Sequence, residues 1–162
     1  MSVKDSLLKK AAIQEKDIIS NLMQFYFYDF SEFIDMNVGN AGLYSGYPYL
    51  DQYWEEDGRY PYLIESEGKY AGFVLVREVV EEGQKYWSIA EFFIMKKFRR
   101  TGLGQRVAHQ VFDSHKGNWE VGQIEKNKPA QIFWRKVIGN YTNGQFEEKT
   151  EEGMILQVFC NK

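Results

Sequence analysis

The sequence contains a single cysteine, Cys160, among its 162 residues. One cysteine excludes an internal disulfide and any metal cluster built from several cysteines, and we predict no metal site. Because Cys160 lies in an apolar segment near the C-terminus, we expect it to be a buried core residue.

Long apolar runs are also missing from the sequence. No stretch of eighteen apolar residues could cross a membrane, and Met1 to Ser6 lack the apolar core of a secretory signal. These absences predict a soluble, cytoplasmic protein with no membrane partner.

Positive charge is scarce. The chain has 20 Lys and Arg against 23 Asp and Glu, a net charge of −3, and its basic residues do not form a tail. Since clustered basic residues are the usual electrostatic mark of nucleic-acid binding, we expect no nucleic-acid partner. The acidic excess favours a small or cationic partner instead.

Aromatic residues, in contrast, are abundant: they make up 17% of the chain, with twelve Phe and eleven Tyr. This exceeds what the packing of one small core requires, so some of them are expected to line a cleft. A chain of this length that is 44% hydrophobic can bury a substantial core, and we predict one domain over residues 1–162.

Hydrophobic periodicity predicts the secondary structure of the first half. Apolar residues at helical spacing predict a helix over residues 14–33, and a Gly-, Tyr- and Asp-rich loop with room for one short helix follows over 37–58. Three strands rich in β-branched and aromatic residues come next, joined by Gly-containing turns that favour antiparallel hairpins: 60–65, 70–76 and 86–95.

Helices and strands alternate in the second half. We predict a helix over 102–115, a strand over 119–125, a helix that begins after Asn127, and strands near 145–150 and 153–160. This order predicts an α+β domain built on one mixed sheet. Since a helix separates them, the strands ending at Met95 and starting at residue 119 should be parallel neighbours.

The predicted strand-to-helix turn Arg99-Arg100-Thr101-Gly102-Leu103-Gly104 carries the clearest chemical signal. Such a turn directs backbone N–H groups and the positive end of the helix dipole at one point, which suits a phosphate. Gly102 and Gly104 allow close approach of the backbone, while Arg99 and Arg100 add charge. These features predict a pyrophosphate ligand.

Two other pyrophosphate-binding patterns fit this turn poorly. A Walker motif requires Lys followed by Ser or Thr after its last Gly, where this chain has Gln105 and Arg106. The Rossmann pattern of three spaced glycines followed by an acidic residue on the next strand is not met either.

The turn resembles the signature of the GNAT superfamily of acyl-CoA N-acyltransferases. That signature is Gln or Arg, two residues, Gly, one residue, then Gly or Ala, and it is matched by Arg99, Gly102 and Gly104. The segment Asn127 to Trp134 resembles the Asn, Ala and aromatic pattern that opens the family's next helix. The resemblance implies a mainly antiparallel mixed sheet flanked by helices, acetyl-CoA as cosubstrate and transfer of acetyl to an amine.

The resemblance also implies which residues bind acetyl-CoA. The backbone N–H groups from Arg100 to Gly104, with Thr101 and Leu103 between them, would hold the pyrophosphate, and Asn127 and Phe133 would contact the cofactor. The pantetheine arm would pair with the backbone of Phe92, Phe93, Ile94 and Met95. The alternatives are that Phe92 and Phe133 are ordinary core and that Asn127 only caps a helix.

Glu91 is the candidate general base, because it interrupts an otherwise apolar strand directly before the expected cofactor-binding stretch. GNAT members often place an acidic residue there. Burial among Trp87, Phe92 and Phe93 would make it a better proton acceptor at neutral pH. The alternative is a solvated strand carboxylate, and Glu125 is a weaker candidate for the same role.

The general acid is less clear, because Trp134 stands where many family members carry Tyr. An indole N–H can donate a hydrogen bond but cannot deliver a proton at useful pH. Tyr141 is a second candidate. The departure leaves a noncatalytic acyl-CoA-binding module as an alternative function. His109 and His115, on the helix after the turn, are predicted to be surface residues.

Residues 26–57 combine aromatic and acidic side chains with little positive charge, a combination that suits a cationic amine. In GNAT proteins this region shapes the acceptor site, so we predict an aminoglycoside, a polyamine or a peptide amine, bound by Tyr26, Tyr28, Asp29 and Trp54. The alternative is an acidic solvated loop whose aromatics anchor in the core. The aromatic content and the C-terminal strands are compatible with a homodimer.

Overall fold

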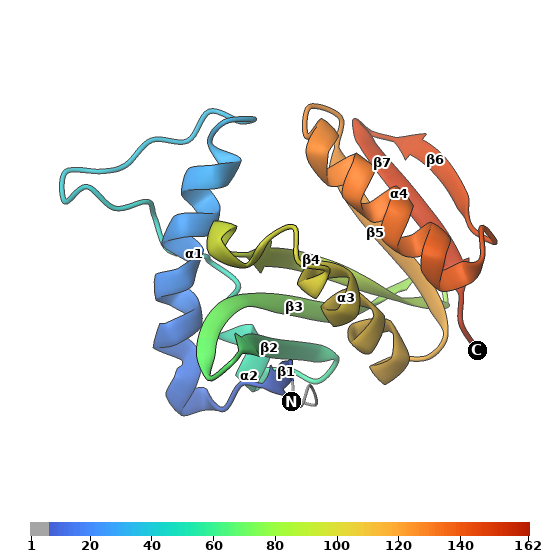
Figure 1. Cartoon of the computed structure of the whole chain (residues 1–162), viewed down its shortest axis with the longest axis horizontal. Helices are drawn as coiled ribbons and strands as arrows, with labels where there is room; N and C mark the ends of the chain where they lie inside the picture. Colours follow the sequence, from blue (N-terminus) through green and yellow to red (C-terminus); the bar gives the residue numbers. More distant parts are fainter. Residues whose placement is uncertain (1–6) are drawn as a thin grey trace. The chain divides into compact units, whose positions relative to one another are not determined.

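The computed structural model describes residues 7–162, and Figure 1 shows how the elements follow one another. In this part of the chain seven strands form one sheet in the order β1-β2-β3-β4-β5-β7-β6. The strands are β1 (Leu8–Lys10), β2 (Arg59–Ser66), β3 (Lys69–Glu81), β4 (Gln84–Ile94), β5 (Asn118–Ile124), β6 (Glu147–Glu151) and β7 (Met154–Cys160). The α-helices are α1 (Lys16–Phe30), α2 (Gln52–Glu55), α3 (Leu103–Ser114) and α4 (Lys128–Thr142), and the short 3-10 helices are η1 (Ile13–Glu15) and η2 (Lys96–Phe98).

The predicted fold class, a mixed and mainly antiparallel sheet with flanking helices, is confirmed. β1 pairs antiparallel with β2, and β7 pairs antiparallel with both β5 and β6. β4 and β5 run parallel, with Trp87 opposite Trp119 and Ser88 opposite Glu120. These are the parallel neighbours predicted from the intervening helix, since a parallel pair needs a long crossover connection.

The chain forms two compact units. The N-terminal unit contains the chain up to Leu75 together with Glu91–Phe98, and the C-terminal unit contains Val76–Ala90 and Arg99–Lys162. Strands β3 and β4 therefore each contribute residues to both units.

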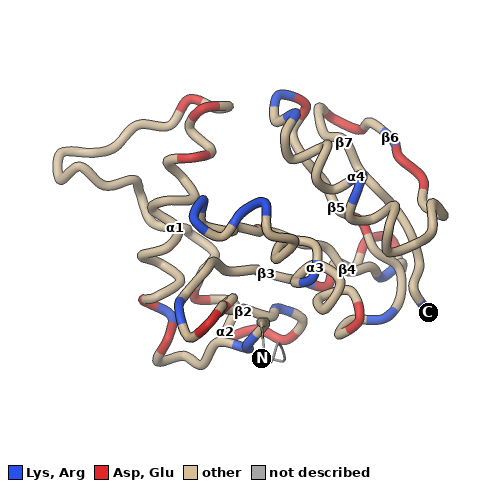
Figure 2. The backbone as a smooth tube through the Cα atoms, in the orientation of Figure 1, with Lys and Arg blue, Asp and Glu red and all other residues tan. Residues whose placement is uncertain are grey.

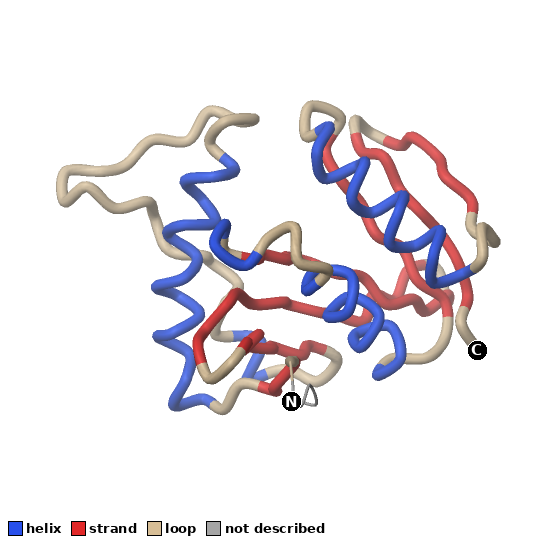
Figure 3. The backbone as a smooth tube through the Cα atoms, in the orientation of Figure 1, coloured by secondary structure: helices blue, strands red, loops and turns tan. Residues whose placement is uncertain are grey.

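In the N-terminal unit, α1 buries Ile19, Leu22 and Met23, whose spacing of three and four residues places them on one helical face. The prediction of this helix and of a short helix in the following loop, α2, is confirmed. The segment between them, residues 31–51, is loop and turn, drawn in tan in Figure 3. Strand β1, at three residues, was too short for periodicity to indicate.

A close approach of β3 to β4 fixes the end of β4. A Cβ on Gly72 would lie 1.8 Å from the carbonyl oxygen of Phe93, so only glycine fits at this position. Directly beside it, the N–H of Met95 donates to the carbonyl of Ala71 at 2.8 Å.

Three hairpins share one turn chemistry. Glu67-Gly68, Glu82-Gly83 and Glu152-Gly153 each supply two residues with positive φ, from 50° to 79°. A two-residue turn with two positive φ values matches the right-handed twist of the flanking strands. Glycine adopts a positive φ without strain, and it occupies the second position of each turn. The Gly-containing turns predicted from the sequence are confirmed.

In the C-terminal unit, α4 packs against β5 and β7 and contacts α3. Phe112 lies at the centre of an aromatic cluster, with ring centroids 4.9 to 6.4 Å from those of Trp119, Trp134, Tyr141 and Phe159. Strand β6 is exposed along its whole length and carries four charged residues, which discourage further strand pairing.

Two sequence predictions about single residues are wrong. Cys160 is exposed, because β7 buries Ile155, Gln157 and Phe159 on one face and position 160 belongs to the other. His115 is only 6% exposed and packs on Trp87 with 4.5 Å between ring centroids. It follows the last residue of α3, and its ring also lies 6.4 Å from that of Trp119. His109 is half-buried, with its ring nitrogen 3.1 Å from the carbonyl oxygen of Val137.

Candidate active site

The Glu91 carboxylate lies in the N-terminal unit with a different tyrosine bound to each oxygen. The Tyr26 hydroxyl donates to Oε1 at 2.5 Å, and the Tyr47 hydroxyl donates to Oε2 at 2.9 Å. Glu91 is half-buried on β4, Tyr26 comes from α1 and Tyr47 from the 31–51 loop. Three segments distant in sequence therefore meet at one carboxylate.

Tyr26 is half-buried, and its ring packs on the core of the N-terminal unit. Its ring meets Phe73 edge-on at 5.6 Å between centroids and lies 5.7 Å from Phe93. Burial, followed by the nearby negative charge of Glu91, raises the pKa of Tyr26 well above its ordinary value. The phenol is therefore protonated at neutral pH and acts as a donor.

Tyr47 was not singled out by the sequence analysis. It stood among several tyrosines of an aromatic segment, and nothing in the local pattern separates it from Tyr44 or Tyr49. Only the folding of the loop over α1 brings its hydroxyl to Glu91, so its role required the tertiary structure.

The stretch expected to pair with the pantetheine arm spans the end of β4. Phe93 and Ile94 have buried side chains, while Phe92 and Met95 are half-buried. The Phe93 side chain belongs to the core, since its ring packs against those of Tyr26 and Phe73. A backbone role for residues 92–95 is compatible with this packing and stays a prediction.

The turn before α3 has the conformation expected of an anion-binding turn. Arg100 and Gly102 have φ values of 63° and 84°, and Gly102 is the N-cap of α3. Within the described chain no N-cap side chain bonds to this helix, and the Leu103 N–H lies 3.4 Å from Oγ1 of Thr101. Turns with left-handed residues direct successive N–H groups into an anion-binding hollow.

The surroundings of this turn also fit a phosphate group. Apart from Gly102 and its two neighbours in the chain, no described residue has an atom within 4 Å of where a Cβ on Gly102 would stand. Arg99 and Arg100 are both exposed, and Gly104 is half-buried in the first turn of α3. The backbone donors, the open space and the cationic side chains are what a pyrophosphate requires.

The family model of the GNAT acetyltransferases matches residues 20–139, which is 120 of the 162 residues. The chain belongs to the GNAT acetyltransferase family. No curated protein matches the sequence.

Solved structures of GNAT acetyltransferases share this fold at low sequence identity. An acetyltransferase from Thermus thermophilus has a TM-score of 0.65 and 14% identity, over 95% of this chain and 96% of that one. A GNAT acetyltransferase from Streptococcus pneumoniae has a TM-score of 0.62 and 13% identity, over 96% of this chain and 99% of that one. An aminoglycoside acetyltransferase from an uncultured soil sample, solved with sisomicin, has a TM-score of 0.63 and 13% identity, over 93% of this chain and 96% of that one. At these identities the likeness shows the fold alone.

In the GNAT chain described here, Asn127 is the N-cap of α4. Its Oδ1 accepts from the N–H of Ala130 at 3.1 Å, so the capping reading of this residue is correct. The cap uses the carbonyl end of the amide, and the Nδ2 end is not required for it. The predicted cofactor contact of Asn127 is compatible with the cap and stays a prediction.

The two candidates for the general acid both lie in the C-terminal unit. Trp134 is 6% exposed, and its ring contacts Phe112 and the half-buried Phe133. The Tyr141 hydroxyl donates to Asp113 at 2.7 Å and accepts from Asn161 at 3.2 Å, and burial raises the pKa of this tyrosine. These contacts favour a packing role for both side chains.

The predicted acceptor-binding residues are all in the N-terminal unit but have different surroundings. Tyr26 contacts Glu91 directly. Tyr28 is 68% exposed and Asp29 half-buried. The Trp54 indole donates to the carbonyl of Ala11 at 2.9 Å, which anchors α2 to the segment between β1 and η1.

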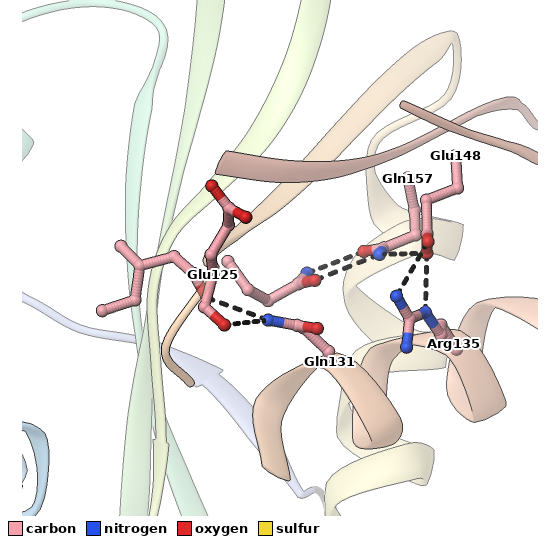
Figure 4. A network of polar contacts seen from close by, with 7 residues as sticks. Glu125, Gln131, Arg135, Glu148 and Gln157 are labelled. Atoms are coloured by element: carbon pink, nitrogen blue, oxygen red, sulfur yellow. Dashed lines mark hydrogen bonds and ion pairs between the residues drawn. The ribbon is translucent and has the colours of Figure 1, made fainter. Parts of the chain in front are cut away.

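Glu125, the weaker candidate for the base, is exposed at the end of β5 in the C-terminal unit. Figure 4 shows its backbone carbonyl and that of Ile124 accepting from the Gln131 side chain, each at 3.0 Å. Beyond them, the amides of Gln123 and Gln157 bond each other in both directions, and Gln157 also donates to Glu148, which pairs with Arg135. Glu125 therefore has an ordered backbone but none of the phenolic donors that surround Glu91.

Among residues 7–162, no group of three or more His, Cys, Asp or Glu is arranged to hold a metal ion. The helices of this same part of the chain include none long and apolar enough to span a bilayer.

Proposed function

We propose that this GNAT acetyltransferase transfers the acetyl group of acetyl-CoA to a primary amine of a cationic small molecule or peptide. The observation that carries the proposal is the Glu91 carboxylate, oriented by Tyr26 on one oxygen and Tyr47 on the other. Family membership supports the acetyl transfer, and the carboxylate supports the amine.

Glu91 supplies the proton acceptor that an amine acceptor needs. A primary amine is an ammonium ion at neutral pH and must lose a proton before its nitrogen can attack a carbonyl carbon. Glu91 accepts that proton, directly or through a water molecule, while Tyr26 and Tyr47 keep its oxygens oriented. When bound, acetyl-CoA supplies an acetyl group already activated as a thioester, so a modest base is sufficient.

We further propose that the turn before α3 holds the pyrophosphate of acetyl-CoA. The backbone N–H groups from Arg100 to Gly104 donate to its oxygens, and the guanidinium groups of Arg99 and Arg100 balance its charge. The positive φ values and the open space at Gly102 support this assignment. The roles of residues 92–95, Asn127 and Phe133 rest on the family resemblance.

The charge of the N-terminal unit supports a cationic acceptor. Residues 17–58 contain eight carboxylates and no Lys, Arg or His, and Figure 2 shows no basic residue along α1 after its start or in the loop that follows. The carboxylates are Asp17, Asp29, Glu32, Asp35, Asp51, Glu55, Glu56 and Asp57. Such a region attracts ammonium groups and repels anionic acceptors.

One family model spans residues of both compact units, which supports the proposal that residues 1–162 act as one N-acetyltransferase domain. Its cytoplasmic location stays a prediction from the sequence.

A noncatalytic acyl-CoA-binding module is the second candidate function. The observation that favours it is the buried Trp134, at the position where many family members carry Tyr. Binding without turnover would leave Glu91 with no amine to deprotonate.

The test combines binding with turnover. Thermal unfolding is followed with acetyl-CoA, and thiol release from acetyl-CoA is then measured with polyamines, aminoglycosides and Lys-containing peptides. A hundredfold excess over the dissociation constant should add roughly 2.7 kcal/mol of stability. Stabilisation with amine-dependent thiol release supports the enzyme, stabilisation without release supports the binding module, and absence of both contradicts each proposal.

A further inference from the structure

Gln24 on α1 binds the backbone of Tyr44 in both directions. Its Nε2 donates to the carbonyl of Tyr44 at 3.1 Å, and its Oε1 accepts from the N–H of Tyr44 at 2.9 Å. This pairing requires both the oxygen and the nitrogen of the side-chain amide, because one accepts and the other donates. The contact ties the middle of the 31–51 loop to the helix.

Other contacts of Tyr44 strengthen the attachment. Its ring meets Phe27 edge-on at 6.2 Å between centroids, and its hydroxyl lies 3.4 Å from Oγ of Ser31. The Ser31 hydroxyl in turn donates to the carbonyl of Tyr28 at 2.6 Å. The loop is therefore fixed to α1 at Tyr44, three residues before Tyr47.

One helix thus controls both phenols that bind Glu91. Tyr26, two residues after Gln24, donates to Oε1 directly. Tyr47 donates to Oε2 from a loop that carries no regular hydrogen-bonded structure from Asp35 to Gly39 or from Leu43 to Tyr47. Loss of the attachment at Tyr44 would leave the position of Tyr47 to the other contacts of the loop, such as the Leu50 N–H that donates to the Tyr47 carbonyl and the ring of Tyr49.

We propose that Gln24 is a positioning residue of the active site, which holds Tyr47 against Glu91 by fixing the backbone of Tyr44. This inference rests on the proposed function, because it assigns Gln24 an effect on catalysis through Tyr47 and Glu91. Gln24 itself contacts neither oxygen of Glu91. Its effect on turnover is transmitted only by the placement of the Tyr47 hydroxyl.

A double-mutant cycle tests this transmission. Gln24→Ala and Tyr47→Phe should each lower kcat for amine acetylation about tenfold, since small losses of alignment are costly in catalysis, and leave KM for acetyl-CoA unchanged. Combining them should lower kcat no further than Tyr47→Phe alone, because both changes remove the same contact. Additive losses in the double variant would overturn the inference.

Hydrogen exchange gives a readout that does not depend on activity. In Gln24→Ala, amide exchange over residues 38–51 should rise about fivefold or more, since the loop loses its attachment. Asn21→Ala, which changes an exposed amide on the same helix, is the matched control and should leave both exchange and kcat unchanged. Unchanged exchange in Gln24→Ala would overturn the inference whatever the activity.

The two proposals fail in different ways. If the parent protein turns over no amine, the proposed function fails and the catalytic role of Gln24 fails with it. If the parent turns over an amine but the cycle is additive, only the role of Gln24 is overturned. Gln24→Glu, which keeps the acceptor but places a carboxylate against the Tyr44 carbonyl, should match Gln24→Ala rather than the parent.

Discussion

Glu91 shows how much single residues reveal in a sequence and how much they do not. Two things selected it: a carboxylate in an apolar strand directly before the stretch expected to line the cofactor, and the family resemblance. Its partners were not equally visible: Tyr26 was selected only as an acceptor-binding residue, and Tyr47 and Gln24 were not selected at all. Their contacts join positions 65, 44 and 20 residues apart, which periodicity cannot pair.

The raised pKa of Tyr26 predicts a loss of stability in alkaline solution. The unfolded chain releases the Tyr26 proton near pH 10, whereas the buried phenol keeps it, so the folded state binds more protons and its stability falls as pH rises above about 10. In Tyr26→Phe the decline should be shallower, as measured by urea unfolding between pH 8 and about 11.

The decline should not disappear in that variant, because burial also raises the pKa of Tyr62 to about 12. An alkaline decline in Tyr26→Phe as steep as in the parent would contradict the assignment.

A substitution at Gly102 tests whether the turn before α3 binds the pyrophosphate. Gly102→Asp places bulk and negative charge in the open space beside the N-terminus of α3 and should abolish the stabilisation by acetyl-CoA in thermal unfolding. Gly144→Asp is the matched control, since Gly144 has a φ of 81° and equally open surroundings. Both variants carry the same backbone strain, so the control should keep its response to acetyl-CoA. An equal response in the two variants would place the cofactor elsewhere.

At the scale of elements, the sequence predicted the helices and strands more completely than it predicted the contacts of single residues. Every predicted helix and strand is present, because the apolar spacing and the Gly-containing turns act locally. The errors lie where local signals are weak: β1 has only three residues, and β3 continues to Glu81, beyond the apolar run that identified it. Cys160 was misplaced because the face of a strand depends on its register, not on its composition.

The paired amides of β5 and β7 give a test of packing within the C-terminal unit. Gln157 is fully buried, and Gln157→Leu would leave the Gln123 amide without its partner, at a cost of about 1–3 kcal/mol in the free energy of unfolding. Adding Gln123→Leu removes the unsatisfied group, so the double variant should recover most of the loss in urea unfolding. If the double variant is less stable than Gln157→Leu, the Gln123 side chain contributes to the free energy of unfolding by more than its hydrogen bonds with Gln157.

At the scale of the whole molecule, the net charge of −3 hides a strong asymmetry. Residues 17–58 carry −8, so the remaining residues together carry +5. This division suits an enzyme whose acceptor is a cation and whose cosubstrate is an anion. The sequence predicted the fold and the family, but the acceptor's identity depends on the shape of loops that local patterns do not specify.

The acidic segment predicts a salt dependence for the acceptor. An acceptor with several ammonium groups should show a KM that rises as ionic strength increases from 0.01 M to about 0.15 M, because the Debye length falls from about 30 to 8 Å. A monoamine acceptor is the control and should respond less. Equal responses of the two acceptors would contradict electrostatic recognition by residues 17–58.

Replacing the Glu91 carboxylate by an amide, in Glu91→Gln, measures what this side chain contributes to proton transfer from the acceptor amine. The amide is nearly isosteric with the carboxylate but cannot take a proton from an ammonium ion, so kcat for amine-dependent thiol release should fall by about 10²-fold or more. Stabilisation by acetyl-CoA should be unchanged in the same variant. A kcat within a factor of about two of the parent would contradict the assignment of Glu91 as the general base.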